Sequence, residues 1–374
     1  MSKLKIGYVG CGWMAQKVHI PNIVGLEDEC ELVAIAEVRP ELGRKVQQRW
    51  RIPALYESHT LLAKDKNVQA VCVSGHWAGQ GEIAIDLLNA GKDVFMEKPM
   101  AMSVEQAERI LEAERKSGKR LMIAYMKRYD AGNVMVKNLI DQYRASGELG
   151  RLQYVRNHGM PGEWTGGLNT PMENTNETVP NPPEAIWPNW LPKEHQKGYL
   201  GYLEKYSHNI NLLRWFLGVE NEQVQVKSAT FELQAEQPYP KLVLLMTGVT
   251  VLKINGIITV IESGNVKCHD WNEHTQLYFE KGWIKTETPC LLLRNVPASV
   301  EVYRGDLAAP CTSRFFPENG RSWSYIEEMK HFIQCLRDGT PFRSTAADAM
   351  NDVKTLEAIY RKHLKTLAQE KDNE

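Results

Sequence analysis

Short apolar runs alternate with helical patterns over the first 125 residues of the chain. The apolar runs cover residues 4–9, 32–36, 68–74, 94–96 and 121–124. Runs of this length that alternate with helices are typical of parallel strands buried on both faces. We therefore predict an α/β fold whose first domain, residues 1–125, is a Rossmann domain with a doubly wound parallel sheet.

The pattern changes after residue 125. A helical segment over 131–145 predicts a linking helix within residues 126–148, and a strand follows over 152–158. Beyond an irregular segment and an amphipathic helix over 200–217, the chain shows successive strands separated by turns. The strands include residues 224–227, 242–247, 249–260 and 275–279, with turns near Gly264, Gly282 and Pro297. Terminal helices are expected over residues 325–336 and 346–367. Residues 149–374 are predicted to form a second α/β domain with a mostly antiparallel sheet, whose terminal helices pack back on the first domain.

A glycine-rich turn follows the first apolar run and opens a helix. Gly10, Gly12 and Ala15 have the spacing G-x-G-x-x-A. The first glycine permits a tight turn, the second lets the backbone approach a pyrophosphate, and the alanine allows close packing of helix on strand. The N-terminus of this helix offers unpaired N–H groups to phosphates. The turn therefore predicts a dinucleotide site that also includes Trp13 and Met14.

An acidic residue ends the second apolar run. Glu37 lies 37 − 12 = 25 residues after Gly12, close to the spacing of about 20 at which this fold places the carboxylate for the adenosine ribose. That carboxylate would repel a 2′-phosphate, which favours NAD as the cofactor. Arg39 could instead pair with the phosphate of NADP, which is the alternative. A surface acid near a helix is the alternative interpretation of Glu37.

The most informative motif is Glu97-Lys98-Pro99, directly after the strand predicted over residues 94–96. A lysine at the carboxyl end of a parallel strand lies in the crevice where doubly wound sheets bind their ligands. The proline stiffens the turn and permits a cis bond. Packing does not explain a charged residue beside a nicotinamide, so we interpret Lys98 as catalytic and place Glu97 and Lys98 at the cofactor site. A lysine that caps the surface is the alternative.

A second polar group lies on the helix predicted over 200–217. Glu204, His208 and Asn211 are spaced by four and three residues, which places them on one helical face. A histidine with a carboxylate one turn before it can act as an oriented general base. Oxidation of an alcohol needs such a group for the hydroxyl proton, which Lys98 could share. A surface histidine paired with Glu204 is the alternative interpretation.

Composition and charge argue against several other classes of protein. The 374 residues carry a net charge of −1, which gives no electrostatic reason to expect nucleic acid or an acidic membrane as a partner. No signal peptide is expected, and no apolar stretch approaches the ~20 residues that span a bilayer. The seven cysteines, an odd number without a C-x-x-C, are expected to be reduced in a cytoplasmic protein. No metal is expected, because no His/Cys cluster has the spacing of metal ligands.

Together these motifs resemble the Gfo/Idh/MocA oxidoreductases, which include glucose–fructose and inositol enzymes, over nearly the whole chain. The motifs are Gly10-x-Gly12-x-x-Ala15, Ala90–Val94 with Glu97-Lys98-Pro99, Arg128-Tyr129, and Glu204-x-x-x-His208-x-x-Asn211 with Trp215-x-x-Gly218. The resemblance implies a Rossmann domain plus an α/β domain with a large open antiparallel sheet, through which members often form homo-oligomers. It implies Lys98 and His208 as catalytic residues. It also implies Glu204 in place of the usual aspartate, Asn211 where inositol-type members have another aspartate, and Arg128 as a substrate contact.

The loop after the strand predicted over residues 68–74 departs from the family pattern. The usual Thr-Pro-Asn is Gly75-His76-Trp77 here, and Gln80 stands where a later histidine is usual. We expect Ser74, Gly75, His76 and Trp77 to line the cofactor site, with Trp77 beside the nicotinamide or the substrate.

The irregular segment over 159–197 is rich in Pro, Asn, Gly and Trp. Loops of this length are often functional. We predict that its three tryptophans, Trp164, Trp187 and Trp190, cover the apolar face of a sugar, with His158 as a further substrate contact. The alternative is that the tryptophans pin the loop to the domain or to a neighbouring subunit.

These residues and the resemblance lead to one functional hypothesis. The chain is expected to transfer hydride between NAD or NADP and a secondary hydroxyl of a pyranose or cyclitol ring. The long segment, Glu204 and Asn211 favour a glucose-like sugar or glycoside oxidised at C3 over plain inositol. Two alternatives are a redox-neutral glycosidase that uses NAD transiently, and a dinucleotide-binding regulator or scaffold without turnover.

Overall fold

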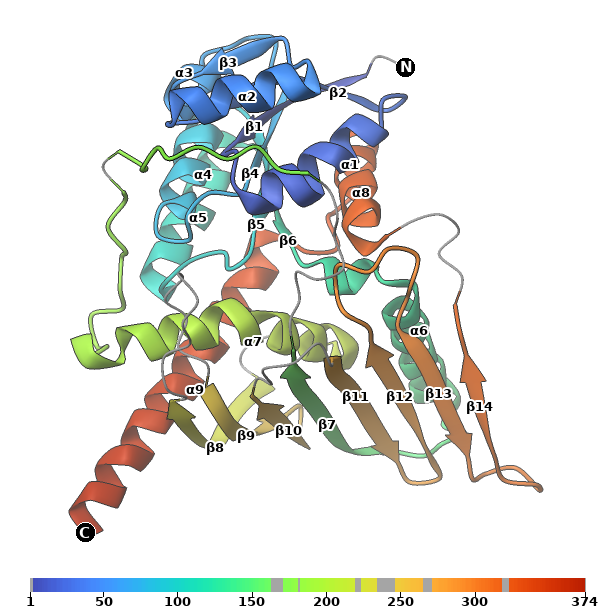
Figure 1. Cartoon of the computed structure of the whole chain (residues 1–374). Helices are drawn as coiled ribbons and strands as arrows, with labels where there is room; N and C mark the ends of the chain where they lie inside the picture. The colour runs from blue at the N-terminus through green and yellow to red at the C-terminus, as the bar shows by residue number, and fades with distance from the viewer. Residues whose placement is uncertain are drawn as a thin grey trace. The chain divides into compact units, whose positions relative to one another are not determined.

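The computed structural model describes residues 3–162, 171–180, 182–218, 223–233, 246–264, 271–317 and 323–373. The chain divides into two compact units (Figure 1). The first unit contains residues 1–126, 169–189 and 325–353, and the second contains residues 127–168, 190–324 and 354–374. The segment 169–189 therefore belongs to the first unit, although it falls within the second predicted domain, residues 149–374.

The first unit is built on a six-stranded parallel sheet with the order β3-β2-β1-β4-β5-β6. Its strands are β1 (Leu4–Val9), β2 (Cys30–Ala36), β3 (Ala54–Tyr56), β4 (Ala70–Val73), β5 (Asp93–Glu97) and β6 (Leu121–Ala124). The strand order reverses between β1 and β4, and this point marks the ligand crevice of a doubly wound sheet. The predicted Rossmann sheet is confirmed.

Helices pack around this sheet, and those before β6 join its strands. They are the π-helical turn η1 (Ala15–His19) with α1 (Ile20–Gly25), α2 (Pro40–Trp50), α3 (His59–Ala63), α4 (Gln80–Asn89), α5 (Val104–Ser117) and α8 (Ser324–Asp338). Ser103 caps α5, because its side chain accepts a hydrogen bond from the Gln106 N–H at 3.2 Å. The first turns of α9 (Ala346–Asn373) also belong to this unit and bury Ala346, Ala349 and Val353 in its core.

The second unit is built on an eight-stranded sheet with the order β14-β13-β12-β11-β7-β10-β9-β8. Its strands are β7 (Leu152–Pro161), β8 (Val224–Leu233), β9 (Met246–Ile254), β10 (Ile257–Ser263), β11 (Trp271–Phe279), β12 (Gly282–Thr288), β13 (Ser299–Arg304) and β14 (Cys311–Phe315). Only the β7–β10 pair is parallel among the described pairs. The prediction of a mostly antiparallel sheet is confirmed.

The predicted continuous strand over 249–260 is wrong. The chain turns at Asn255-Gly256, where φ is +48° and +85°, and β9 and β10 pair as a hairpin. An Asn-Gly pair favours a two-residue turn with positive φ at both positions. The strand predicted over 242–247 lies mostly outside the described residues, and its last two residues belong to β9.

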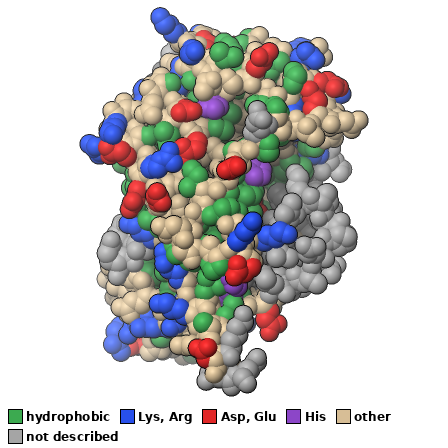
Figure 2. All heavy atoms as spheres, turned by 90° about the vertical axis from the view of Figure 1, so that its left-hand side faces the viewer, with side chains coloured by type: hydrophobic (Ala, Val, Ile, Leu, Met, Phe, Trp, Pro, Cys, Tyr) green, Lys and Arg blue, Asp and Glu red, His purple; other side chains and the backbone are tan. Residues whose placement is uncertain are grey.

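Two helices cover one face of this second sheet, α6 (Ala131–Ser146) and α7 (Gln196–Leu217) (Figure 1). Gly218 ends α7 with φ of +64°, a conformation that glycine adopts without strain. Lys, Arg, Asp and Glu side chains are interspersed on the face drawn in Figure 2, so neither sign of charge dominates there. Within the described ranges, no helix has the length and apolar character needed to cross a bilayer.

Candidate functional site

The glycine-rich turn lies at the carboxyl end of β1. Gly10 has φ of +92°, and an added Cβ would lie 2.9 Å from the carbonyl oxygen of Ser74. Gly12 differs, because no described atom beyond its own neighbours lies within 4 Å of an added Cβ. The first glycine is therefore required by the fold itself, whereas the second leaves the surface of the turn open to a ligand. Trp13 and Met14 follow it, both half-buried.

Glu37 at the end of β2 is 5% exposed and is engaged by the turn beside it. Its Oε2 accepts a hydrogen bond from the Cys11 N–H at 2.7 Å. Arg39 donates to the same carboxylate through Nε at 2.8 Å and through a terminal nitrogen at 3.0 Å. This bidentate pair holds Nε and one terminal nitrogen of the guanidinium on Glu37, so the positive charge of Arg39 is already matched by a carboxylate.

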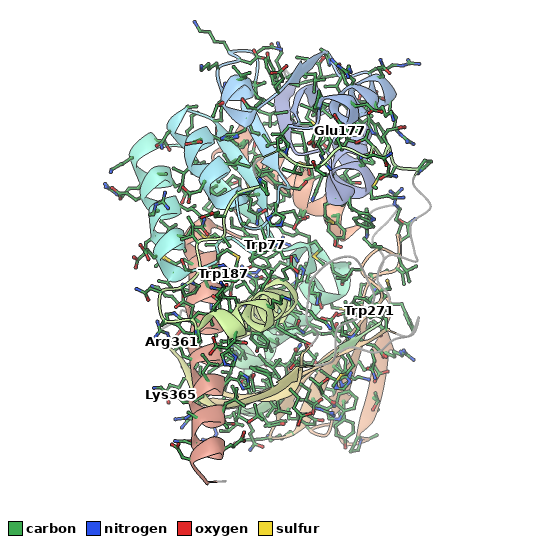
Figure 3. All side chains as sticks on the ribbon, turned by 60° about the vertical axis from the view of Figure 1, so that its left-hand side comes forward. Trp77, Glu177, Trp187, Trp271, Arg361 and Lys365 are labelled. Atoms are coloured by element: carbon green, nitrogen blue, oxygen red, sulfur yellow. The ribbon has the colours of Figure 1, made fainter. Side chains whose placement is uncertain are left out.

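The loop after β4 carries four predicted cofactor residues, Ser74, Gly75, His76 and Trp77. The hydroxyl of Tyr8 donates to Ser74 Oγ at 2.7 Å, which fixes the start of the loop on β1. The rings of His76 and Trp77 lie 4.4 Å apart, and Trp77 lies 5.8 Å from Trp187 (Figure 3). The loop therefore presents an aromatic cluster at the carboxyl edge of the sheet.

Lys98 follows β5 at the same edge, on a turn that three side chains organise. Gln80 donates through Nε2 to the carbonyl of Glu97 at 3.0 Å and to that of Pro99 at 2.6 Å. The Glu97 carboxylate accepts the Lys98 N–H at 3.1 Å, and its other oxygen lies 2.8 Å from His19 Nε2. The Lys98–Pro99 bond is cis, and Lys98 is half-buried. The sequence analysis did not identify Gln80 and His19 as residues that position this turn, although it noted Gln80 as a departure from the family pattern.

A buried carboxyl group on α8 belongs to the same region of the first unit. Glu328 is fully buried, and neither carboxyl oxygen has a hydrogen-bond partner among the described residues. Burial, and then repulsion from Glu97, raises the pKa of Glu328 well above its usual value. The carboxyl group therefore holds its proton at neutral pH, and ionising it would leave a second negative charge near Glu97.

Glu328→Gln is expected to flatten the dependence of stability on pH. Because the folded-state pKa is raised, the stabilisation is fully present below the unfolded-state pKa and is lost as pH rises through the folded-state value. Thermal melts between about pH 5 and pH 9 should show wild type losing up to ~1.4 kcal/mol per pH unit relative to the variant. Glu327→Gln, at the half-buried neighbouring position that pairs with Lys330, is the control. Parallel curves for wild type and Glu328→Gln would contradict the assignment.

In the second unit, α7 carries the predicted catalytic histidine. Glu204 and His208 are half-buried on this helix. Asn211 and Arg128 are 1% and 2% exposed, and Arg128 Nε donates to Asn211 Oδ1 at 2.6 Å. The guanidinium also lies 6.0 Å from the ring of Trp215. Arg128 and Asn211 thus form a buried clamp between α7 and the turn η2 (Met126–Tyr129), and their predicted substrate contacts remain a prediction.

Below α7 lies a layer of buried polar groups that the sequence analysis did not find. Asn209 donates to Asn157 Oδ1 at 2.7 Å, and Asn157 donates to Thr275 Oγ1 at 2.8 Å. Lys127 and Glu273, each 5% exposed at the side chain, form a buried ion pair beside them. These residues come from four elements far apart in the sequence, so no local pattern indicates them.

Lys205 adds a titratable group to the helix of His208. Its Nζ donates to the carbonyl of Gly264 at 2.5 Å. Burial lowers the pKa of Lys205 to about 7, although Glu273 acts in the opposite direction. The helix α7 therefore carries, besides the predicted general base, an amine that exchanges its proton near neutral pH.

His158 lies on the other face of the sheet from α7. Its neighbours Asn157 and Gly159 face α7, as the Asn157–Asn209 bond shows, so the side chain between them points away. There His158 stacks on His274 at 4.8 Å and lies 2.5 Å from Glu262. This placement gives no support to the predicted contact between His158 and substrate.

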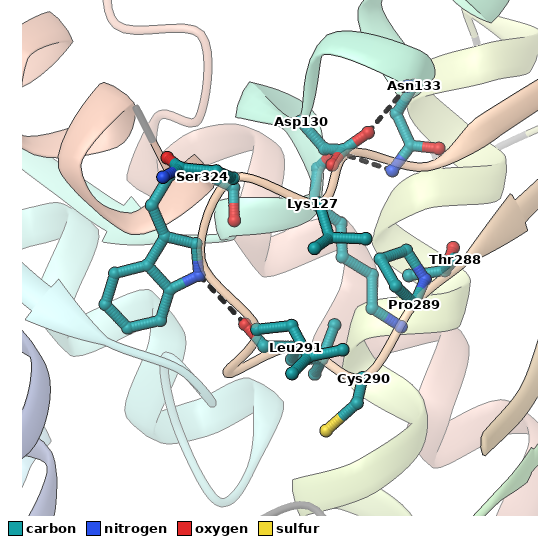
Figure 4. Close-up of a pocket in the computed structure, with 12 residues that line it drawn as sticks. Lys127, Asp130, Asn133, Thr288, Pro289, Cys290, Leu291 and Ser324 are labelled. Atoms are coloured by element: carbon teal, nitrogen blue, oxygen red, sulfur yellow. Dashed lines mark hydrogen bonds between the residues drawn. The ribbon is translucent and has the colours of Figure 1, made fainter. Parts of the chain in front are cut away.

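A small cavity lies near the start of α6 in the second unit (Figure 4). Lys127, Asp130 and the segment Thr288–Leu291 line it, and its volume is about 20 Å³. Asp130 caps α6 by accepting the Asn133 N–H at 3.1 Å. The cavity is the size of one water molecule and cannot hold a sugar ring.

The three tryptophans of the long segment do not act alike. Trp164 lies outside the described residues. Trp190 is anchored, because its Nε1 donates to Glu357 at 2.9 Å and Arg361 covers its ring at 4.2 Å. Trp187 packs against Trp77 in the first unit. Trp190 therefore pins the segment to α9, as the alternative interpretation expects, whereas Trp187 packs on the loop after β4. That these tryptophans cover a sugar stays a prediction.

Comparisons with known proteins show which families and enzymes the chain is similar to. The family described as "Oxidoreductase family, NAD-binding Rossmann fold" (GFO_IDH_MocA) matches residues 4–125. Inositol 2-dehydrogenase of Salmonella typhimurium is 28% identical over 344 residues, which cover 90% of this chain and 87% of that protein. Myo-inositol 2-dehydrogenase of Thermotoga maritima is 23% identical over 339 residues, which cover 90% of each protein.

Solved structures share the fold. Aldose–aldose oxidoreductase from Caulobacter crescentus superposes with a TM-score of 0.74 at 20% identity, over 98% of both chains. A 3-ketoreductase from Actinomadura kijaniata, solved with NADP and TDP-benzene, superposes with a TM-score of 0.72 at 17% identity, over 96% of this chain and 98% of that one. At these identities the similarity establishes the architecture alone.

Proposed function

We propose that the chain is a Gfo/Idh/MocA oxidoreductase that acts as an NAD-dependent dehydrogenase of a ring hydroxyl on a sugar or cyclitol. The family match over residues 4–125 and the similarity to inositol 2-dehydrogenase support this proposal. The observation that carries the proposal is the turn of Lys98. It lies at the carboxyl edge of an NAD-binding Rossmann sheet, and Gln80, Glu97 and His19 hold its backbone in place. Such elaborate support for one surface turn is expected where a side chain must meet a ligand in a defined geometry.

The proposed chemistry divides between the cofactor and the chain. The nicotinamide, when bound, accepts or returns the hydride. Gly12 leaves room for the pyrophosphate, and Glu37 lies where the adenosine ribose is expected. Lys98 orients the substrate hydroxyl, His208 takes its proton, and Glu204 orients and stabilises the protonated histidine. Asn211 and Arg128, through their clamp, hold the part of α7 that carries His208.

Within this class we favour a glucose-like ring oxidised at C3, either free or as a glycoside. The support is the aromatic cluster of Trp77 and Trp187, since aromatic rings cover the C–H faces of pyranoses well. Inositol is the competing substrate, because the curated relatives named above are inositol dehydrogenases.

The test is a panel of sugars, cyclitols and glycosides assayed with NAD and with NADP. Formation of NADH is read at its absorbance band, and each glycoside is also checked for cleavage. Oxidation of a pyranose or cyclitol supports the proposal. Cleavage of one anomer of a glycoside without net formation of NADH would instead indicate a redox-neutral glycosidase. Dinucleotide binding without any turnover would favour a dinucleotide-binding regulator or scaffold.

Trp187→Ala should raise KM for the sugar about tenfold while leaving the melting temperature close to that of wild type. Trp190→Ala should do the reverse, because it removes the hydrogen bond to Glu357 and the stacking of Arg361. The expected cost is about 1–3 kcal/mol of stability, with the KM for sugar and the affinity for NAD little changed. Steady-state kinetics and thermal melts of both variants separate the two roles. If Trp187→Ala changed only the melting temperature, the aromatic cluster would be structural.

We also propose that the chain forms a homo-oligomer through the face of the second sheet opposite α6 and α7. Ile258, Tyr154, Tyr278, Trp283 and Tyr303 face one another across five adjacent strands and form an apolar row there. A row of this kind is unusual on a surface exposed to water. Light scattering that returned the 42.6 kDa mass of one chain would contradict the proposal.

A further inference from the structure

An extended segment, residues 171–177, crosses the first unit near the N-terminus of α2 (Figures 1 and 3). The carboxylate of Glu177 accepts hydrogen bonds from the Glu41 N–H at 3.0 Å and the Leu42 N–H at 2.9 Å. Thr175 donates to the same carboxylate at 3.1 Å. A side chain 177 − 37 = 140 residues after Glu37 therefore caps the helix that follows Glu37.

The same segment is tied to the glycine-rich turn. Gln16 and Glu173 exchange two hydrogen bonds, with Gln16 Nε2 donating to the Glu173 carbonyl at 3.1 Å and the Glu173 N–H donating back at 2.8 Å. Gln16 also donates to the Cys11 carbonyl at 2.8 Å. On α2, Arg49 pairs with the Glu173 carboxylate at 3.1 Å. The segment thus links the two elements, the turn and the start of α2, between which a Rossmann fold holds the adenosine ribose.

Two groups near this ribose could attract a 2′-phosphate, and each already has a carboxylate partner within the chain. The N–H groups of α2 bind Glu177, and the guanidinium of Arg39 binds Glu37. Burial tends to raise the pKa of Glu177, but hydrogen bonds from Glu41 and Leu42 outweigh it, so the pKa of Glu177 is lowered. Glu177 is therefore ionised at neutral pH. At this end of α2, a 2′-phosphate would meet the negative charge of Glu177, and the described N–H groups of Glu41 and Leu42 are already bonded to it.

We propose that Glu177 is a specificity-determining residue that excludes 2′-phosphorylated dinucleotides by occupying the N-terminus of α2. The inference rests on the proposed function, since it takes the first unit as the site of the dinucleotide. It differs from the role of Glu37, because Glu37 meets the ribose hydroxyls whereas Glu177 removes the place where a phosphate would bind.

The test compares Glu177→Gln with Glu184→Gln, an exposed position beyond the segment in the same unit. The probes are NADH and NADPH, titrated by nicotinamide fluorescence, and the fragments 5′-AMP and adenosine 2′,5′-bisphosphate, titrated by calorimetry. Measurements are made at low ionic strength, because salt screens charges near the surface. Wild type and Glu184→Gln should prefer NADH and 5′-AMP. Glu177→Gln should shift both preferences at least about tenfold toward the phosphorylated probe, mainly through tighter binding of that probe.

Several results would overturn the inference. In Glu177→Gln the ratio of the Kd for NADPH to the Kd for NADH could stay as in wild type. Alternatively, the affinities for NADH and NADPH could fall by the same factor, which would mean that Glu177 only holds the segment in place. Glu173→Gln removes the ion pair with Arg49 in the last turn of α2 and so loosens the segment, but it leaves the Glu177 carboxylate at the N-terminus of α2. An equal shift in that variant would therefore also count against Glu177. Failure of the proposed function is distinct, because wild type would then bind dinucleotide with the expected preference yet oxidise nothing in the substrate panel.

Discussion

Lys98→Ala and His208→Ala are each expected to lower kcat by about 10²–10⁴ while the proteins still bind NAD, because removal of a positioned acid or base costs that much. The kcat of the double variant should be only slightly lower than that of the less active single variant, since the effects of two groups that act on one proton are not additive. Stopped assays of NADH formation, together with calorimetric titration of NAD, measure both quantities. Lys116→Ala, an exposed lysine on α5, should keep wild-type turnover and serves as the control.

Glu204→Gln refines this first prediction. Its proposed role is to orient and stabilise protonated His208, so the amide should reduce kcat less than either alanine variant does. It should also move the pH profile of kcat, which a merely structural carboxylate would not do. Near-normal turnover in Lys98→Ala or in His208→Ala would remove that residue from the mechanism.

Gly12→Val is expected to abolish dinucleotide binding without loss of stability. An added Cβ at Gly12 meets no described atom within 4 Å, so the valine fits the protein, but it occupies the approach of the pyrophosphate. Calorimetry should show NAD affinity reduced at least about 100-fold, with a melting temperature near that of wild type.

Gly10→Ala is the matched comparison for Gly12→Val, and it should reduce the stability of the protein itself. At φ of +92°, with the Ser74 carbonyl 2.9 Å from an added Cβ, even a methyl group strains the turn. We expect a loss of stability of more than about 1 kcal/mol, seen as a lower melting temperature before any ligand is added. Tight NAD binding by Gly12→Val would contradict the placement of the pyrophosphate.

Local signals in the sequence accounted for much of the fold. Strands, caps and turns depend on residues that are neighbours along the chain, as with Ser103 at the start of α5 and Gly218 at the end of α7. The missed hairpin at Asn255-Gly256 was also local, and its Asn-Gly pair could have been recognised as a turn. The dinucleotide turn and the motif of Lys98 were found for the same reason, since each is a short run with a fixed spacing.

The supports of the site could not be found in this way. Gln80 and His19 hold the turn of Lys98 from positions 98 − 80 = 18 and 98 − 19 = 79 residues before it. The different roles of Trp187 and Trp190, three residues apart, depend on Trp77 and Glu357, which the sequence does not associate with either.

The sequence by itself determined the order of strands and helices, the glycine-rich turn and the chemical identity of the candidate catalytic groups, because periodicity and backbone preference act over a few residues. Only the tertiary structure decided which partners those groups have. It paired Arg39 with Glu37, buried Asn211 against Arg128 and brought Glu177 to the N-terminus of α2. The physical reason is that a polar side chain near a buried region takes whichever donor or acceptor the packed chain brings within about 3 Å, whatever its distance along the sequence.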